Sequence, residues 1–185
     1  MDFHDVFILF MAFSLIGYIL EIYFIKIESY FRKVPYEHPT YGWLPLSFPY
    51  GFGAIASIFF ALSYTDANIF ISIVFCWIGF LFIEYASALF CEYILKTKYW
   101  DYSYLKHHIK GRVCLRNSIF FTIGGLFVIK YFTFPSIQLL EGLSTSFKDF
   151  LFIILVVIFL SYLFLSNRIK GLLSKLKNVI FHRYN

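Results

Sequence analysis

Residues 84–118 read EYASALFCEYILKTKYWDYSYLKHHIKGRVCLRNS, and this stretch joins one apolar segment of the chain to the next. It begins with two carboxylates, Glu84 and Glu92, inside an otherwise apolar run. A basic, aromatic connection follows, which contains Trp100-Asp101-Tyr102-Ser103 and Gly111-Arg112-Val113-Cys114-Leu115. Ionisable groups are costly inside a bilayer and usually mark function there. We therefore expect the functional site in this stretch.

The composition of the whole chain predicts a membrane protein. Its 185 residues have a mean hydropathy of +0.73, and 60% of them are hydrophobic while 15% are charged. A soluble domain carries about 25% charged residues. Long apolar runs predict an all-α fold, a polytopic bundle of membrane helices that forms one domain. The aromatic content of 24% suits lipid-facing surfaces and interfacial belts.

Five apolar segments have lengths at or near the roughly 20 residues that cross a bilayer as a helix. They cover about residues 6–25, 49–64, 69–95, 113–134 and 150–166. The connections between them are loops at 26–48 and 96–112 and turns at 65–68 and 135–147. We therefore predict about five transmembrane helices, within a bundle that comprises residues 1–166.

The first loop contains an apolar stretch at residues 41–48. Pro35, Pro39 and Pro45 exclude a long helix through the loop. The stretch is too short to span a bilayer. It is either an interfacial loop anchored by its tryptophan or a segment that dips between covering helices.

The second apolar segment opens with small residues. They stand at positions 51, 53, 54, 56 and 57, and they predict close approach of a neighbouring helix. No Lys-Ser or Lys-Thr follows the glycines, so this is not a phosphate-binding loop.

The tail, residues 167–185, has a different pattern. Apolar residues recur at helical spacing, and lysines lie off that face. The apolar positions are Ile169, Leu172, Leu173, Leu176 and Ile180. We predict a C-terminal amphipathic interfacial helix whose partner is membrane lipid on the anionic side.

The basic residues predict an orientation. In a five-helix path, 14 of the 16 lysines and arginines fall on one side, and only Lys130 and Lys148 flank the other. The positive-inside rule then places the N-terminus outside the cell membrane and the C-terminus in the cytoplasm. Because the positive charge is confined to these connections and the tail, we expect no nucleic-acid partner, despite the net charge of +5.

Two further features bear on processing and redox state. The sequence MDFHDVFILF has acids where a signal peptide needs basic residues, so we expect residues 1–25 to be retained as a helix. Cys76, Cys91 and Cys114 are odd in number and lie in or near apolar segments, which predicts reduced, packed thiols.

Glu84 is predicted to lie deep in the membrane. It stands eleven residues before Leu95, which is about 16 Å along a helix. A carboxyl group at that depth costs at least about 2–3 kcal/mol when it faces lipid. We expect Glu84 to face the bundle, either protonated or paired. It then serves a proton-linked or substrate-linked site, or it is a protonated residue that hydrogen-bonds a neighbouring helix for packing.

A second group of polar residues is expected near the cytoplasmic boundary. Glu21 and Glu92 reach a comparable depth there, and Arg112 and Arg116 enter the membrane from the same side. With Asp101 they form a cluster if the first, third and fourth segments are neighbours. The cluster is either functional or a set of interfacial salt bridges with snorkelling arginines.

Other combinations of residues carry little weight. His107 and His108 with Cys114 match no zinc-binding spacing, and a pair such as Ser103 and His107 is common in loops. Trp100 and the neighbouring tyrosines are typical of an interfacial belt. We therefore predict no metal, no cofactor and no catalytic residue.

Several motifs together resemble the CmpB-type ABC-transporter permease family of small integral membrane proteins. The matching stretches are Gly17-Tyr18-Ile19-Leu20-Glu21, Tyr50-Gly51-Phe52-Gly53-Ala54, Glu84-Tyr85, Glu92, Trp100-Asp101-Tyr102-Ser103, Gly111-Arg112-Val113-Cys114-Leu115 and Ser118. The resemblance covers about residues 13–130, and the Trp-Asp-Tyr-Ser and Gly-Arg-x-Cys-Leu pair is its most specific part.

The resemblance implies a transport component. The sequence has no Walker A motif, so ATP hydrolysis would come from a separate ATPase subunit, and so few helices imply a homo-oligomer or a larger complex. The functional polar cluster that we predict comprises Glu21, Glu84, Glu92, Trp100, Asp101, Tyr102, Ser103 and Arg112. Two alternatives stay open: a lipid-modifying enzyme or scramblase at the cytoplasmic leaflet, with Asp101, His107 and Arg112 at head-group level, and a structural or regulatory membrane subunit.

Overall fold

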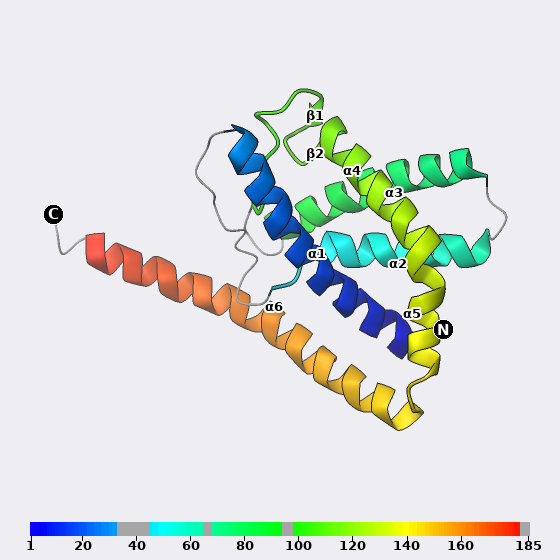
Figure 1. Ribbon diagram of the computed structural model, residues 1–185. Coiled ribbons are helices and arrows are strands. Elements are labelled where there is room, and N and C mark those ends of the chain that lie inside the picture. Colours follow the sequence, from blue (N-terminus) through cyan, green and yellow to red (C-terminus); the bar gives the residue numbers. More distant parts are fainter. Residues whose placement is uncertain (33–44, 65–67, 94–97, 182–185) are drawn as a thin grey trace.

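The computed structural model describes residues 1–32, 45–64, 68–93 and 98–181, with side chains up to residue 165 except those of residues 32 and 163. It is a helical bundle with one small hairpin (Figure 1). The elements are α1 (Phe3–Arg32), α2 (Phe48–Ser63), α3 (Ile69–Tyr93), β1 (His108–Ile109), β2 (Val113–Cys114), α4 (Leu115–Phe127), the π-helical η1 (Val128–Phe132), α5 (Thr133–Glu141) and α6 (Thr145–Phe181).

Glycines let α1 and α2 pack closely in antiparallel fashion. A Cβ atom on Gly17 would lie 2.2 Å from Cβ of Tyr50, and one on Gly51 would lie 2.7 Å from the carbonyl oxygen of Phe10. Further along, Ile8 and Ile58 share a buried apolar cluster. Because the partner on α1 moves toward its N-terminus as α2 advances, the two helices run in opposite directions.

The next two helix pairs are also antiparallel. Gly53 of α2 packs under the ring of Phe80 on α3, and Phe60 stacks on Phe75 with ring centroids 4.1 Å apart. Phe80 in turn stacks on Phe121 of α4 at 6.0 Å, and Gly125 fits against Cys76. The small residues at 51 and 53 thus serve close helix contacts, as the sequence predicts.

The last helix, α6, runs parallel to α1 and lies along it in Figure 1. At one end Nδ1 of His4 is 2.9 Å from Oδ1 of Asp149, and Nζ of Lys148 is 3.0 Å from Oδ1 of Asp5. Farther along, Phe10 packs edge-on against Phe159. Helices α1 and α6 therefore run in the same direction where they pack together.

Among the described residues, four helices are long and apolar enough to cross a membrane: Phe3–Phe31, Ile69–Tyr93, Leu115–Glu141 and Thr145–Tyr162. The remaining apolar helix, α2, has 16 residues and is shorter than the usual span. The coarse prediction of a polytopic helical membrane protein is supported. The predicted count of five spanning helices is not established by these lengths.

Three predicted boundaries were wrong, those of the first, fourth and fifth segments, and the fifth begins at Thr145 rather than near residue 150. The first segment does not end near residue 25, because α1 continues to Arg32. The fourth does not end at 134, because α4, η1 and α5 form one continuous helix to Glu141, and the turn before α6 shortens accordingly. Pro135 lacks an N–H and would clash in a regular helix. The π-helical turn just before it, where Thr133 Oγ1 donates to the carbonyl of Val128 at 3.2 Å, accommodates the proline.

The structure describes the end of the first loop, residues 45–47, and most of the backbone of the predicted tail. Leu46 and Ser47 are buried, and the N–H of Ser47 donates to the carbonyl of Ser14 at 2.9 Å, so the residues before α2 dip against the middle of α1. Residues 41–44 lie outside the described part of the chain. At the other end α6 continues without a break to Phe181. The interfacial placement of residues 167–185 remains a prediction.

Candidate functional site

Glu84 lies inside the bundle, on the buried face of α3. Its residue is 4% exposed. One carboxylate oxygen, Oε1, accepts a hydrogen bond from the phenol of Tyr102 at 2.9 Å. The other, Oε2, is buried with no hydrogen-bond partner among the described residues. The expectation that Glu84 faces inward is therefore confirmed, and its partner comes from the connection between α3 and α4.

The connection positions Tyr102 through its own backbone. The N–H of Tyr102 donates to the carbonyl of Gly111 at 2.8 Å, which ties the two sides of the connection together. Gly111 has φ of +72°, a left-handed conformation that favours glycine. A Cβ atom there would also lie 2.4 Å from Oδ1 of Asp101. Glycine at 111 thus lets the Trp-Asp-Tyr-Ser turn sit directly on the β1–β2 hairpin.

A chain of side chains sets the direction of the hydrogen bond from Tyr102. Nε of Arg116 donates to Oδ1 of Asn117 at 3.2 Å, which leaves the Asn117 NH₂ group for the oxygen of Tyr102. The phenol proton must then point to Glu84. Burial, followed by the charge of Glu84, raises the pKa of Tyr102 well above its ordinary value, so the phenol stays a donor.

Glu21 stands on α1 opposite this pair. Its Oε2 accepts a hydrogen bond from the hydroxyl of Ser47 at 3.0 Å. The carboxyl groups of Glu21 and Glu84 are close enough to interact electrostatically. Two carboxyl groups from helices α1 and α3 thus converge on one region of the bundle interior.

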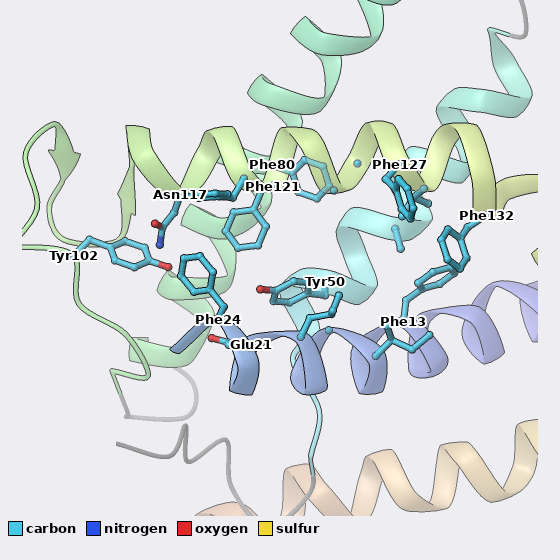
Figure 2. A pocket seen from close by; sticks show the side chains of 18 residues that line it. Phe13, Glu21, Phe24, Tyr50, Phe80, Tyr102, Asn117, Phe121, Phe127 and Phe132 are labelled. Carbon is cyan, nitrogen blue, oxygen red and sulfur yellow. The ribbon is translucent and has the colours of Figure 1, made fainter. Parts of the chain in front are cut away.

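A cavity of about 410 Å³ lies beside this cluster, between α1, α2 and the α4–η1 helix (Figure 2). Polar side chains gather at one end of it: Glu21, Tyr102 and Asn117. Phe13, Phe127 and Phe132 form the other end. The cavity is therefore amphipathic along its length, and Glu84 lies just behind its polar end, joined to it through Tyr102.

Arg112 anchors the connection to α3. Its Nε lies 3.1 Å from both carboxylate oxygens of Glu92, its Nη2 lies 2.5 Å from Oε2, and its Nη1 donates to the hydroxyl of Tyr85 at 3.2 Å. Nε1 of Trp100 donates to the carbonyl of Arg112 at 2.8 Å. The carboxylate of Glu92 raises the pKa of Arg112 further, so the guanidinium stays charged. These contacts hold the hairpin against the end of α3.

Asp101 closes the turn at the solvent side. Its Oδ2 lies 2.6 Å from Nζ of Lys98, and its Oδ1 accepts hydrogen bonds from both the N–H and the hydroxyl of Ser103, at 2.9 and 2.6 Å. Lys98 and then Ser103 lower the pKa of Asp101 to about 2. The polar atoms of Asp101 and Ser103 are thus used within the turn itself.

The eight predicted residues therefore fall into two groups. Glu21, Glu84 and Tyr102 meet at the polar end of the cavity. The other five, Glu92, Trp100, Asp101, Ser103 and Arg112, fold and anchor the connection. Arg116, expected in one cluster with Arg112, pairs instead with Glu28 at 2.7 Å.

Sequence reasoning missed Tyr50, Asn117 and Tyr85. Tyr50 and Asn117 line the cavity, and Tyr85 bonds to Arg112. Two of these had a signal, since Tyr50 and Tyr85 belong to the motifs that carry the family resemblance. Asn117 is an amide in the opening turn of an apolar segment, which is unusual enough to be a signal as well.

The histidines and cysteines lie apart from this site. Nδ1 of His108 accepts a hydrogen bond from the N–H of Gly111 at 3.0 Å, and His108 pairs with Cys114 across the hairpin. All three cysteines are buried, and none of them forms a disulfide. Within the described residues, no group of three His, Cys, Asp or Glu side chains is arranged to hold a metal ion.

Fold and site together define a small polytopic helical membrane protein with two carboxyl groups near the polar end of a cavity. The chain belongs to the family described as "Putative ABC-transporter type IV" (ABC_trans_CmpB), whose model matches residues 8–166. This match extends beyond the motifs at 13–130 and includes α6 as far as residue 166. Comparison with curated proteins gives no match, and neither does comparison with solved structures.

Proposed function

We propose that this chain is the membrane-embedded component of an ABC-type transport system, and that its cargo contacts the cluster of Glu21, Glu84 and Tyr102. The observation that carries the proposal is the placement of buried Glu84 directly behind the polar end of a cavity of about 410 Å³, with one oxygen that has no partner among the described residues. A buried polar group without a partner costs about 1–3 kcal/mol, so a purely structural carboxyl is a poor choice there. A ligand that arrives at the cavity would relieve that cost.

The alternative of a lipid-modifying enzyme or scramblase depended on Asp101, His107 and Arg112 as free groups at the head-group level. Asp101 and Arg112 are occupied by Ser103, Lys98 and Glu92. Their contacts maintain the fold of the connection. A transport role therefore agrees better with the geometry than chemistry at these side chains.

The energy source would be a separate ATPase subunit, because the chain has no Walker A motif. The surface for it would be the basic side of the protein, which includes the connection from Lys98 to Arg112 and the tail. We place this side in the cytoplasm of the cell membrane and the end that carries Asp5, Lys148 and Asp149 outside.

Affinity purification from native membranes tests the proposal. A tagged full-length chain should bring down a subunit with a Walker A motif, and Glu84→Gln should bring down the same subunit yet fail to complement a deletion strain. The matched control is Glu141→Gln, which removes an exposed carboxylate at the end of α5 and should complement. If no ATPase comes down, or only further copies of this chain do, the ABC proposal is wrong.

Orientation has its own test. The three native cysteines are buried, so a single cysteine introduced at an exposed position reports its side of the membrane. His107→Cys should react with an impermeant maleimide only in broken cells, and Glu141→Cys should react in intact cells. The reverse pattern would place the N-terminus inside.

A further inference from the structure

We infer that the cavity beside Glu21 and Tyr102 binds an amphiphilic amine, with its ammonium group at the polar end and its hydrocarbon tail between Phe13, Phe127 and Phe132. The inference rests on the proposed function, since it names the class of cargo for the same site.

Charge is the first argument. Of the described residues that line the cavity, Glu21 is the one carboxylate, and none is Lys, Arg or His. Glu84 adds a second carboxyl group behind Tyr102. The nearest arginine on α4, Arg116, is bound to Glu28 and Asn117. An anion would enter a low-dielectric site without a partner, whereas a cation would find one.

The unpartnered oxygen is the second argument. Oε1 of Glu84 accepts a hydrogen bond from Tyr102, and Oε2 has no donor among the described residues. Either protonation state leaves an unsatisfied group: an ionised Oε2 lacks a donor, and a protonated one lacks an acceptor. A cationic head beside Glu21 and Tyr102 would favour the ionised state and supply the missing positive charge.

Aromatic rings supply the third argument. Phe24, Tyr50 and Phe121 lie next to the polar end in Figure 2. Ring faces attract ammonium groups, most strongly when the pair is desolvated. The same rings can also pack against the methylene groups next to the ammonium, so the ligand can be larger than a simple ion.

The far end and the size of the cavity specify the tail. At the far end the cavity is lined by phenylalanines and by Val128. The described η1 residues that line it, Val128 and Phe132, are both apolar. Gly124 forms part of the wall, and a Cβ atom on it would meet nothing within 4 Å. A volume of about 410 Å³ falls within the range of small-molecule sites. A head with an aromatic or alkyl tail therefore fits better than a bare metal cation.

The test uses three probes that differ only in the head: 4-phenylbutylammonium, 4-phenylbutanol and 4-phenylbutyrate. Binding of each radiolabelled probe to the full chain in phosphatidylcholine nanodiscs is measured by equilibrium dialysis, with empty nanodiscs subtracted. We expect the ammonium to bind about tenfold more tightly than the alcohol, a difference of about 1.4 kcal/mol. The carboxylate should not bind above the empty nanodiscs.

Two sets of variants locate the binding. Glu21→Gln and Glu84→Gln should each reduce the preference for ammonium over alcohol by about fivefold or more, which is about 1 kcal/mol of ion-pair free energy. Alcohol binding should persist, and it also shows that the variant is folded. Glu141→Gln is the charge control and should change neither probe.

Gly124→Leu fills the cavity and should abolish binding of both ammonium and alcohol. Its matched control is Gly79→Leu, because a Cβ atom on Gly79 also meets nothing within 4 Å and Gly79 does not line this cavity. That variant should bind as the wild type does.

Three results would overturn the inference: equal binding of the carboxylate, an unchanged preference in both Gln variants, or full binding by Gly124→Leu. Its failure is distinct from failure of the proposed function. An ATPase that copurifies with a chain indifferent to amines refutes only the cargo class. Amine binding without an ATPase refutes the ABC assignment and leaves the site.

Discussion

The phenol of Tyr102 reaches into the bundle and donates to Oε1 of Glu84 at 2.9 Å. Tyr102 comes from the connection between helices, and Glu84 comes from the interior of α3, 18 positions earlier. The environment of the buried Glu84 carboxyl group therefore depends on how the connection between α3 and α4 folds. Loss of the folded connection would expose the polar end of the cavity. The residues that anchor the connection therefore also protect the residues at the cavity.

Removal of the phenol should destabilise the protein. We expect Tyr102→Phe to lower the free energy of unfolding by about 1–2 kcal/mol, since it leaves buried acceptor and donor groups of Glu84 and Asn117 unsatisfied. Combination with Glu84→Leu should cost less than the sum of the two single changes, with a coupling of about 1 kcal/mol. Unfolding titrations in mixed micelles measure all four proteins.

The control for this cycle is Tyr104→Phe. Tyr104 is 50% exposed and donates to Glu28 at 3.2 Å, so its loss should change stability by less than about 0.5 kcal/mol. Additive effects of Tyr102→Phe and Glu84→Leu would contradict the coupling.

Arg112 should not be replaceable by lysine. The guanidinium donates to Glu92 and Tyr85 at once, and a lysine ammonium cannot reproduce that planar fork. We expect Arg112→Lys to lower the midpoint of thermal unfolding nearly as much as Arg112→Ala, and to speed tryptic cleavage after Lys106 and Lys110.

The matched variant is Arg116→Lys. The Arg116 side chain is 41% exposed, against 14% for Arg112. It meets Glu28 through one guanidinium nitrogen, a contact that lysine can make, and lysine would lose only the single hydrogen bond of 3.2 Å from Nε to Asn117. This protein should unfold near the wild-type temperature. Equal loss in both lysine variants would show that Arg112 holds the connection by charge alone.

Glycine should be required at position 111. Its φ is +72°, and an alanine Cβ would lie 2.4 Å from Oδ1 of Asp101 and 2.5 Å from Oγ of Ser103. Left-handed backbone alone costs an L-residue about 1–2 kcal/mol, and the contacts add to it. Gly111→Ala should therefore destabilise by more than about 1 kcal/mol, as measured by unfolding titration.

Gly79→Ala provides the comparison within the same chain. Gly79 is helical and has open space around its Cβ position, so alanine should be neutral or stabilise by up to about 1 kcal/mol. A Gly111→Ala protein as stable as Gly79→Ala would mean that the turn does not need the left-handed conformation.

Acid should weaken the turn at Asp101. Lys98 and Ser103 lower the pKa of Asp101 from 3.8 to about 2, so its ionised form stabilises the folded state. That contribution is complete above about pH 4 and disappears as the pH falls through about 2. Thermal unfolding of wild type and Asp101→Asn should therefore differ at neutral pH and converge between about pH 4 and 2.

Lys98→Met removes the largest cause of that shift. The acid-dependent loss of stability in this variant should be smaller than in the wild type, since the folded pKa returns toward 3.8. An identical pH profile in the two proteins would contradict the role of Lys98.

Much of the candidate site could be predicted from residue type and position. Glu84 is a carboxyl in an apolar run, and the cost of charge in hydrocarbon is enough to predict that it turns inward. The family motifs drew attention to Tyr102 and Arg112. Their division into a cavity group and an anchoring group could not be predicted, because it depends on which side chains α1, α3 and the connection bring within hydrogen-bond distance of one another.

The ends of the helices were predicted less well than their presence. The fourth segment was predicted to end at about residue 134, yet a π-helical turn carries the helix on to Glu141. Proline disrupts regular hydrogen bonding, and whether a local irregularity absorbs the disruption depends on the packing around η1. The N-terminal ends of α1 and α6 lie together and are joined by the ion pair between Lys148 and Asp5.

The amino-acid sequence alone determined that this chain is a helical membrane protein with an inward carboxyl at Glu84. The physical reason is the free-energy cost of charge and of open backbone in hydrocarbon, which acts on composition and spacing. Only the tertiary structure decided three contacts: Tyr102 hydrogen-bonds to Glu84, Arg112 forms an ion pair with Glu92, and Glu21 lines the polar end of a cavity. Those pairings follow from helix contacts over long sequence separations, where close approach at Gly51, Gly53 and Gly125 sets which side chains can meet.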